Sequence, residues 1–130
     1  MPASFTIDVA HGVVISTGTG VFTYADFVTH MKEVRSDPRF NPDFNQLVDC
    51  RAITAMALTS QQIKDLAGHS VFSQRSRRAF VVSSELQFGM TRMFAAYREI
   101  AAKQTIMVCR TLPEALAWLG LPPDFDPEKR

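Results

Sequence analysis

Charged and hydroxyl side chains follow directly on short apolar runs at three places in the chain. Asp49 and Arg51 end the run Asn-Gln-Leu-Val, Ser83 and Ser84 follow Ala-Phe-Val-Val, and Arg110 follows the last apolar run. If these runs are parallel strands, their carboxyl ends meet at one rim of a sheet, where ligands usually bind. Arginines and hydroxyls at such a rim are suited to holding an anionic or polar ligand.

These residues lack the neighbours that a catalytic site needs. The sequence places no histidine or second carboxylate beside Asp49, so a general base has no partner there. Ser84 also stands where a helix N-cap is expected, a role that by itself accounts for the hydroxyl. We therefore predict no catalytic residue and a protein that is not an enzyme. The candidate ligand-binding residues are Asp49, Arg51, Ser83, Ser84, Arg110 and, off the apolar stripe of the longest predicted helix, Arg92.

The histidines and cysteines show no metal-binding spacing. His11, His30 and His69 fit no ligand pattern with one another or with Cys50 and Cys109, so neither a metal nor a cofactor is predicted. If the cysteines lie on strands separated by a third strand, they are about 9–10 Å apart. That distance is too long for a disulfide, so we expect two reduced, packed thiols.

Composition is typical of one globular domain in the cytoplasm. The chain has 130 residues, of which 46% are hydrophobic and 21% charged, and its formal net charge is +1. This balance gives no reason to expect a nucleic-acid partner. No apolar run approaches the roughly 20 residues of a transmembrane helix, and the first residues do not resemble an export signal. Because ten phenylalanines in so small a chain favour an exposed apolar patch, we expect a homodimer, a protein partner or a small ligand.

Five apolar segments predict strands. Residues 4–10 and 12–17 are expected to form an antiparallel hairpin, after which Gly18-Thr19-Gly20 should break the strand. The central strand covers residues 45–51, and two further strands cover residues 79–83 and 105–109. The basic cluster Arg75, Arg77 and Arg78 before the fourth strand is expected to form a solvated turn.

Four helices are predicted from capping pairs and apolar periodicity. The capping pairs are Thr23 with Asp26, Thr59 with Gln62, Ser84 with Gln87, and Thr111 with Glu114. The longest helix has an apolar stripe of Leu86, Met90, Met93, Phe94, Tyr97 and Ile100. Alternating strands and helices predict an α/β fold with a five-stranded mixed sheet, mostly parallel, that begins with an antiparallel hairpin. We assign residues 1–121 to this domain and residues 122–130 to a C-terminal tail that leaves it.

The order of these elements resembles the SpoIIAA-like (STAS-like) bacterial proteins. The resemblance covers about residues 5–119, and its most particular pieces are Leu-Val-Asp, Phe-Gly-Met-Thr-Arg-Met-Phe and Glu-Ala-Leu-Ala-Trp-Leu. It implies a SpoIIAA-like fold and a non-enzymatic binding or regulatory module. Relatives that are anti-sigma-factor antagonists are phosphorylated at a serine after the central strand. The corresponding candidates here are Thr59 and Ser60, although the Asp-Ser-Ser-Gly type of segment is absent.

Three functions remain open after the sequence is read. The first is the non-enzymatic binding or regulatory module that the resemblance implies. The second is a carrier or sensor of a small amphipathic or lipid-like ligand, which the methionines and phenylalanines of the longest helix and the comparison with lipid-carrying CRAL-TRIO domains favour. The third, ranked last, is a partner switch controlled by phosphorylation of Thr59 or Ser60.

Overall fold

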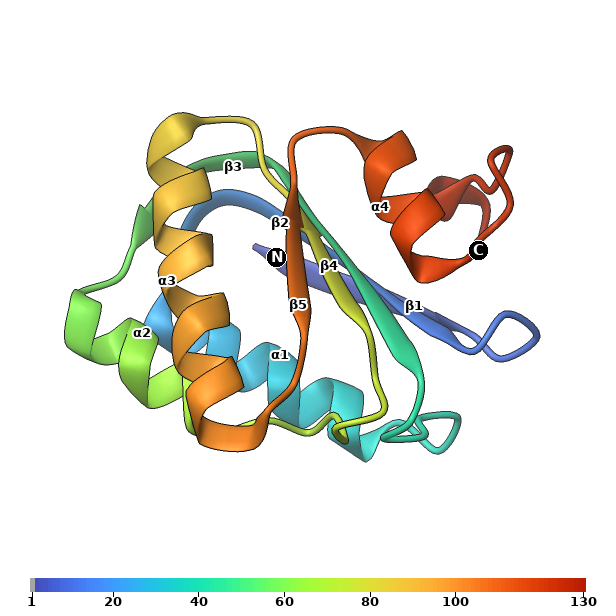
Figure 1. Cartoon of the computed structure of the whole chain (residues 1–130), viewed down its shortest axis with the longest axis horizontal. Helices are drawn as coiled ribbons and strands as arrows, with labels where there is room; N and C mark the ends of the chain where they lie inside the picture. The colour runs from blue at the N-terminus through green and yellow to red at the C-terminus, as the bar shows by residue number, and fades with distance from the viewer. Residues whose placement is uncertain (1) are drawn as a thin grey trace.

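The computed structural model of the chain describes residues 2–130 and shows five strands lying side by side in chain order (Figure 1). β1 and β2 are antiparallel, and each later neighbouring pair is parallel. The predicted mixed sheet with its N-terminal hairpin is therefore confirmed. The strands are β1 (Ala3–Asp8), β2 (Val13–Thr23), β3 (Asn45–Ala57), β4 (Arg78–Val81) and β5 (Ile106–Cys109).

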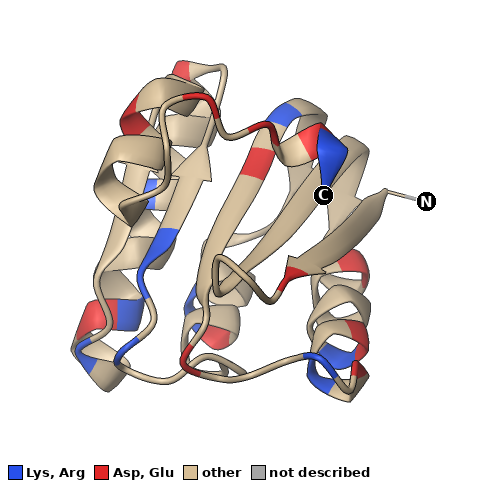
Figure 2. Cartoon of the chain, turned by 90° about the vertical axis from the view of Figure 1, so that its right-hand side faces the viewer, with Lys and Arg blue, Asp and Glu red and all other residues tan. Residues whose placement is uncertain are grey.

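Helices cover the two faces of the sheet unequally. Three of them lie on one face and the fourth on the other, together with the C-terminal segment (Figure 1). The three are α1 (Tyr24–Ser36), α2 (Ser60–Ala67) and α3 (Glu85–Ala102), the fourth is α4 (Leu112–Leu119), and a short 3-10 turn, η1 (Pro127–Lys129), ends the chain. No helix within residues 2–130 is long and apolar enough to cross a bilayer. Figure 2 shows basic and acidic residues interspersed along the ribbon in its view.

All four helices begin at the predicted caps. Each N-cap hydroxyl accepts a hydrogen bond from the backbone N–H three residues later, which satisfies one of the donors that a helix start leaves free. The four N-cap residues are Thr23, Thr59, Ser84 and Thr111. Local sequence signals therefore fix where the helices start.

The second strand does not break at the glycines, contrary to the prediction. β2 continues to Thr23, and its pairing with β3 shifts register on either side of Thr19. A Cβ atom on Gly18 would lie 2.6 Å from Cδ1 of Ile53 in β3, so the Ile53 side chain would have to shift to admit one. Gly18 thus leaves room for the Ile53 side chain and does not mark a turn.

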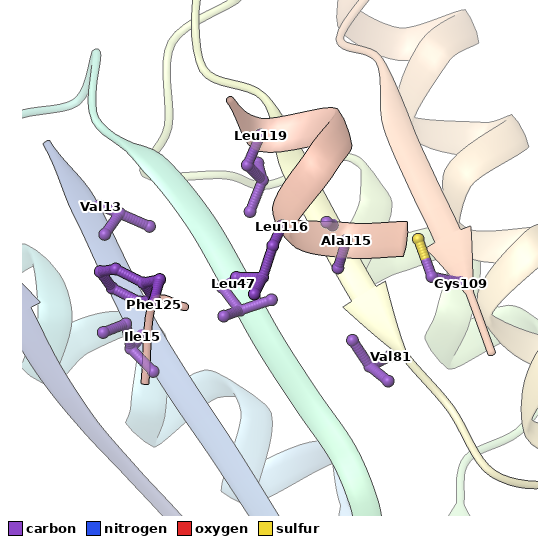
Figure 3. Close-up of a cluster of buried hydrophobic side chains, with 10 residues drawn as sticks. Val13, Ile15, Leu47, Val81, Cys109, Ala115, Leu116, Leu119 and Phe125 are labelled. Atoms are coloured by element: carbon purple, nitrogen blue, oxygen red, sulfur yellow. The ribbon is translucent and has the colours of Figure 1, made fainter. Parts of the chain in front are cut away.

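The core under α4 consists of buried apolar side chains. Figure 3 shows side chains from four strands meeting those of α4 and the C-terminal segment. Leu47 at its centre is fully buried, and Phe125 is only 4% exposed. The residues after Leu121, which we expected to leave the domain, therefore fold back onto the sheet. Arg130 also lies 3.6 Å from the carboxylate of Asp8.

Both cysteines are free and buried, on opposite faces of the sheet. Cys50 lies on β3 among the side chains under α2 and α3, whereas Cys109 lies on β5 under α4. β4 separates the two strands, as expected. Burial, followed by the neighbouring Asp49 charge, raises the pKa of the Cys50 thiol to about 12, so this thiol is protonated at neutral pH.

Candidate functional site

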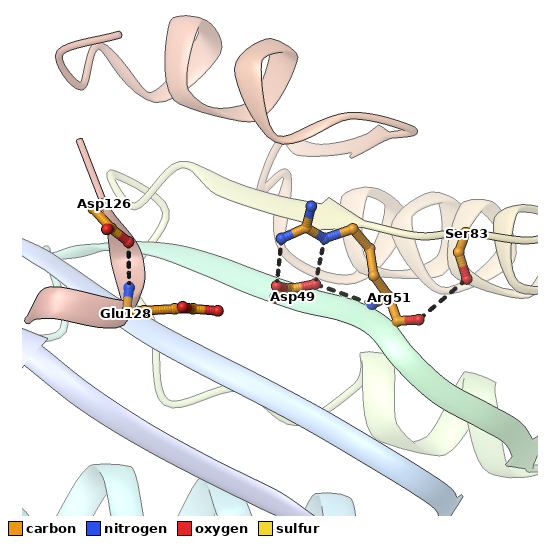
Figure 4. A network of polar contacts seen from close by, with 5 residues as sticks. All are labelled: Asp49, Arg51, Ser83, Asp126 and Glu128. Atoms are coloured by element: carbon orange, nitrogen blue, oxygen red, sulfur yellow. Dashed lines mark hydrogen bonds and ion pairs between the residues drawn. The ribbon is translucent and has the colours of Figure 1, made fainter. Parts of the chain in front are cut away.

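Asp49 and Arg51 bind each other at the rim where β4 ends. Nε and Nη2 of Arg51 donate to the Asp49 carboxylate at 3.0 and 2.9 Å, and the Arg51 backbone N–H donates at 3.0 Å. Burial pulls the pKa of Asp49 upward, but these hydrogen bonds outweigh burial and hold the pKa below its usual value. Figure 4 shows the pair on the side of β3 that faces α4, where the Ser83 hydroxyl donates to the Arg51 carbonyl at 3.4 Å.

Arg110 and Arg92 lie around one phenyl ring near the start of α3. The Arg110 guanidinium stacks 3.9 Å from the centre of the Phe88 ring and donates to Glu85 at 3.0 Å. Arg92 lies 5.8 Å from the same ring. Ser84 caps α3 directly before Glu85. Arg51 and Arg110 therefore already have carboxylate partners in exposed ion pairs, and ligand binding by these arginines stays a prediction.

Thr59 and Ser60 lie at the start of α2. The Thr59 hydroxyl accepts from the backbone N–H of Gln62 at 3.1 Å, and the Gln62 side chain accepts from the Thr59 backbone in return. Ser60 is the exposed first residue of the helix. Phosphorylation of either residue stays a prediction.

A cavity lies on the other face of the sheet, beneath α1, α2 and α3. Its volume is about 80 Å³. Aromatic and sulfur-containing side chains make up much of its wall, among them Phe22, Phe27, Met31, Met90 and Phe94. In the described part of the chain, no group of three or more His, Cys, Asp or Glu side chains is placed to hold a metal ion.

A cleft between α1 and α2 adjoins this cavity. The cleft has a volume of about 430 Å³ and shares four lining residues with the cavity, so the two spaces meet at one wall. The shared residues are Met31, Leu66, Ser70 and Val71. The hydroxyl of Tyr24 in α1 donates to Asp65 in α2 across the same gap.

A chain of hydrogen bonds between polar side chains runs along the cavity wall. Nε of Arg78 donates to Gln46 at 2.8 Å, and the Gln46 amide donates to the Ser16 hydroxyl at 3.0 Å. The Ser16 oxygen lies 2.8 Å from Nε2 of His30. All four residues line the cavity, and they come from three adjacent strands and α1.

His30 ends this chain as a neutral imidazole. Burial, followed by the positive charge of Arg78, lowers the pKa of His30 to about 4. The Ser16 oxygen accepts from Gln46, and the direction of its bond with Nε2 of His30 depends on the imidazole tautomer. Nδ1 is buried and has no hydrogen-bond partner among the residues that the structure describes.

The other end of the chain holds two buried arginines. Oε1 of Gln104 accepts from Arg98 at 3.0 Å and from Arg78 at 3.4 Å, and the two arginines are only 7% and 3% exposed. No Asp or Glu within residues 2–130 forms an ion pair with either arginine. Burial, together with the Arg98 charge, lowers the pKa of Arg78 to about 9.

Three phenyl rings surround the Arg78 guanidinium. Its carbon lies 4.9, 5.6 and 5.7 Å from the ring centres of Phe72, Phe80 and Phe94. Cation–π attraction offsets part of the cost of burying the charge. The lowered pKa of Arg78 shows that the compensation is incomplete.

The prediction of a solvated turn is wrong for Arg78, which is buried. Arg75 is exposed and lies 3.6 Å from Asp43, and Arg77 is exposed against Trp118, as expected for such a turn. Arg78, however, already belongs to β4, and residues two apart in a strand share a face. The apolar Phe80 could therefore have identified Arg78 as a residue of the inner face.

The longest helix buries only part of the predicted stripe. Phe94 is buried and Met90, Met93 and Tyr97 pack partly buried against the same cluster, but Leu86 and Ile100 are 75% and 82% exposed. The fully buried positions of α3 are Gln87, Thr91, Phe94 and Arg98, three of which are polar. An apolar pattern could not reveal a helix that turns polar side chains inward.

Comparison with known proteins supports the fold alone. No protein-family model matches the chain, and no curated protein does. Among solved structures, the chain is similar to the crystal structure of an uncharacterised protein from the DUF3478 family of Shewanella loihica PV-4, described as having a SpoIIAA-like fold. The TM-score is 0.59 at 18% sequence identity, over 90% of this chain and 93% of that one. The protein described here therefore has a SpoIIAA-like fold.

Proposed function

We propose that this protein is a non-enzymatic binding module whose ligand is a small amphipathic molecule. The observation that carries the proposal is the cavity of about 80 Å³ between the sheet and α1, α2 and α3. The carrier or sensor function that the sequence left open thereby becomes the favoured form of the binding hypothesis.

The lining of the cavity supports this proposal, and its volume exceeds that of a single water molecule. Protein interiors are close-packed and contain few voids larger than a water molecule, which occupies about 30 Å³ in the liquid. A mostly apolar space with a few convergent polar groups is typical of a small-molecule site. Here the apolar wall would hold the hydrocarbon part of the ligand, and the side chains of Ser16, His30, Gln46 and Arg78 would meet its polar end.

A protein partner is a second candidate, favoured by the outer side of α3. Leu86 and Ile100 are large apolar side chains that are 75% and 82% exposed. Exposed apolar residues on a helix are typical of interaction surfaces when they form a patch. Self-association or regulation through this surface is therefore kept as a proposal, and sedimentation of the purified chain at several concentrations tests the dimer.

Methionine methyl groups provide a direct test of the cavity. The chain labelled with ¹³C-methyl methionine is titrated with hexanamide, a neutral amphiphile, and followed by NMR. Met31, Met56 and Met90 line the cavity, whereas Met107 is an exposed residue of β5. We expect saturable shifts of the three cavity signals at a ratio of one ligand per chain, with the Met107 signal unchanged.

A cavity-filling variant makes this test specific. Val48 lines the cavity, so Val48→Phe should fill the space and abolish the hexanamide shifts while the fold is retained. Ala117→Phe, on the exposed side of α4, is the matched control and should bind as the unaltered chain does. The proposal fails if hexanamide gives no saturable shift, or if a folded Val48→Phe chain still binds it.

A further inference from the structure

The buried network beside the cavity contains two positive charges and no negative one. Arg78 and Arg98 share a single neutral acceptor, Oε1 of Gln104. Buried charges in proteins are normally paired, because removal from water is costly unless an opposite charge replaces the solvent. The phenyl rings around Arg78 supply only part of that replacement. An anion is the component that this environment lacks.

The unpaired charge lies at the space where a ligand would bind. Arg78 lines the cavity, and so does Gln46, to which Nε of Arg78 donates. Arg98 does not line the cavity and is also held by the Ala67 carbonyl at 3.0 Å. A ligand in the cavity would therefore meet one guanidinium.

We infer that the ligand of this cavity carries a carboxylate, which binds beside Arg78, with an apolar chain against the phenylalanine and methionine wall. The inference rests on the proposed function, because it specifies the chemistry of the molecule that the cavity binds.

The direction of the hydrogen bonds supports an acceptor group on the ligand. Ser16 and Gln46 already use their oxygens to accept from neighbours along the wall. Nδ1 of His30 has no partner in the described chain, and it donates to a ligand in one of the two neutral tautomers. The Arg78 guanidinium has only donors, so it binds an acceptor, and a singly charged carboxylate balances its charge. An ammonium ligand would add a third positive charge and no acceptor.

The adjoining cleft favours the approach of an anion. Lys32 and Arg35 contribute to its lining between α1 and α2. Like charges around a concave surface attract oppositely charged solutes and raise their rate of association. Both the cleft and the cavity therefore favour an anionic ligand over a cationic one.

Three probes of equal chain length test the inference at pH 7.5. Hexanoate, hexanamide and hexylamine differ mainly in the charge of the polar end, and their dissociation constants are measured by calorimetry and by the shifts of the cavity methionines. Because hydrogen bonds to charged groups are the strong ones, we expect hexanoate to bind about tenfold or more tightly than hexanamide. Hexylamine should bind most weakly.

Neighbouring arginines on β4 and the turn before it supply a matched pair of variants. Arg78→Met removes the buried charge and keeps an apolar side chain of similar length, so hexanamide binding should persist while the tenfold advantage of hexanoate disappears. Arg77→Met removes an exposed arginine that lies 5.6 Å from the Trp118 ring, and should leave the hexanoate advantage unchanged.

The outcomes separate this inference from the proposal beneath it. Equal binding of hexanoate and hexanamide, or an advantage of hexanoate that survives in Arg78→Met, overturns the carboxylate assignment while the cavity remains a binding site. Loss of binding for all three probes overturns the proposed function itself. If Arg78→Met does not fold, the Nε–H resonance of Arg78 in the unaltered chain decides the question. Hexanoate should shift that resonance and hexanamide should shift it much less, whereas equal shifts refute the inference.

Discussion

The face of the sheet under α4 and the face under α1, α2 and α3 are built from alternate residues of the same strands. On the α4 face, Leu47, Ala79 and Val81 are fully buried and meet other apolar side chains. On the opposite face, Gln46 and Arg78 occupy the neighbouring positions, are almost as buried, and carry hydrogen-bonding groups. One sheet therefore has an apolar side under α4 and, on the opposite side, a cavity with a partly polar wall.

The helices on the two sides are anchored differently. α4 buries Ala115, Leu116 and Leu119 within only eight residues, and Phe125 closes the same cluster. α1 has 13 residues, but Val34 is its single buried side chain. Local opening is easiest where few apolar side chains are buried, so α1 is the element that we expect to move when a ligand enters. We therefore expect the α4 side to supply stability and, under the proposed function, the side with the cavity to bind the ligand.

The largest expected effect compares Leu47 with Val48, adjacent residues that point to opposite faces. Leu47→Ala should lower the free energy of unfolding by about 3–4 kcal/mol, because it leaves a void in a filled core. Val48→Ala should cost about 1 kcal/mol, because Val48 is half-buried and already borders empty space. Urea denaturation of both variants measures the difference. Equal losses would show that the two faces are packed alike.

Lowering the pH should reduce the stability of the folded chain through His30. Its pKa is about 4 in the folded chain and 6.5 ordinarily, so the unfolded chain binds the extra proton first as the pH falls. Stability is therefore complete above pH 6.5 and is lost progressively between pH 6.5 and 4, by at most roughly 3 kcal/mol. Denaturation midpoints measured across this range test the expectation.

Two substitutions isolate the contribution of His30. His30→Gln removes the titrating group and should flatten the pH dependence between pH 6.5 and 4. His69 lies on the surface with a side chain that is 73% exposed, so His69→Gln should leave the dependence unchanged. A pH profile that stays the same in His30→Gln would mean that the imidazole is not held neutral by burial.

The sequence predicts the local and periodic features of this fold and misses those that depend on contacts between distant segments. Capping depends on residues three apart, and all four predicted caps are present. The continuation of β2 depends on the approach of Ile53 to Gly18, 35 positions apart in the chain, which no local pattern of glycines shows. The fold of the tail likewise depends on Phe125 reaching β2 and α4.

The candidate site also has a part that the sequence could predict and a part that it could not. Asp49, Arg51 and Ser83 follow apolar strands, so their meeting at one rim could be predicted. The polar wall of the cavity could not be predicted. Arg78 follows two other basic residues that are exposed, and nothing in the sequence around Gln46 indicates that it binds Arg78. Methionines and phenylalanines in α3 pointed to an apolar ligand, but only the packing of three helices shows the space for one.

The smallest expected effect concerns the rim, where Asp49 and Arg51 are charged but exposed. Asp37 and Arg39 form a second pair with the same spacing and the same two-pronged geometry, with bonds of 3.1 and 2.9 Å. The Arg side chains of the two pairs are 46% and 55% exposed, and the Asp side chains 26% and 15%. Exposed ion pairs typically contribute 0.2–1 kcal/mol, so double-mutant cycles to alanine should give each pair a coupling energy of at most about 1 kcal/mol.

The two cycles together decide whether the rim differs from an ordinary surface loop. If the Asp49–Arg51 pair only orders β3 where β4 ends, its coupling should match that of Asp37 with Arg39 within about 0.5 kcal/mol, since solvent screens both pairs. Raising the salt concentration should weaken both couplings by similar amounts. A much larger, salt-resistant coupling at the rim would mean that solvent is excluded from Asp49 and Arg51, as happens when a partner or a second copy of the chain covers them. The α4 side of the sheet, which we regard as structural, would then contain a second binding surface.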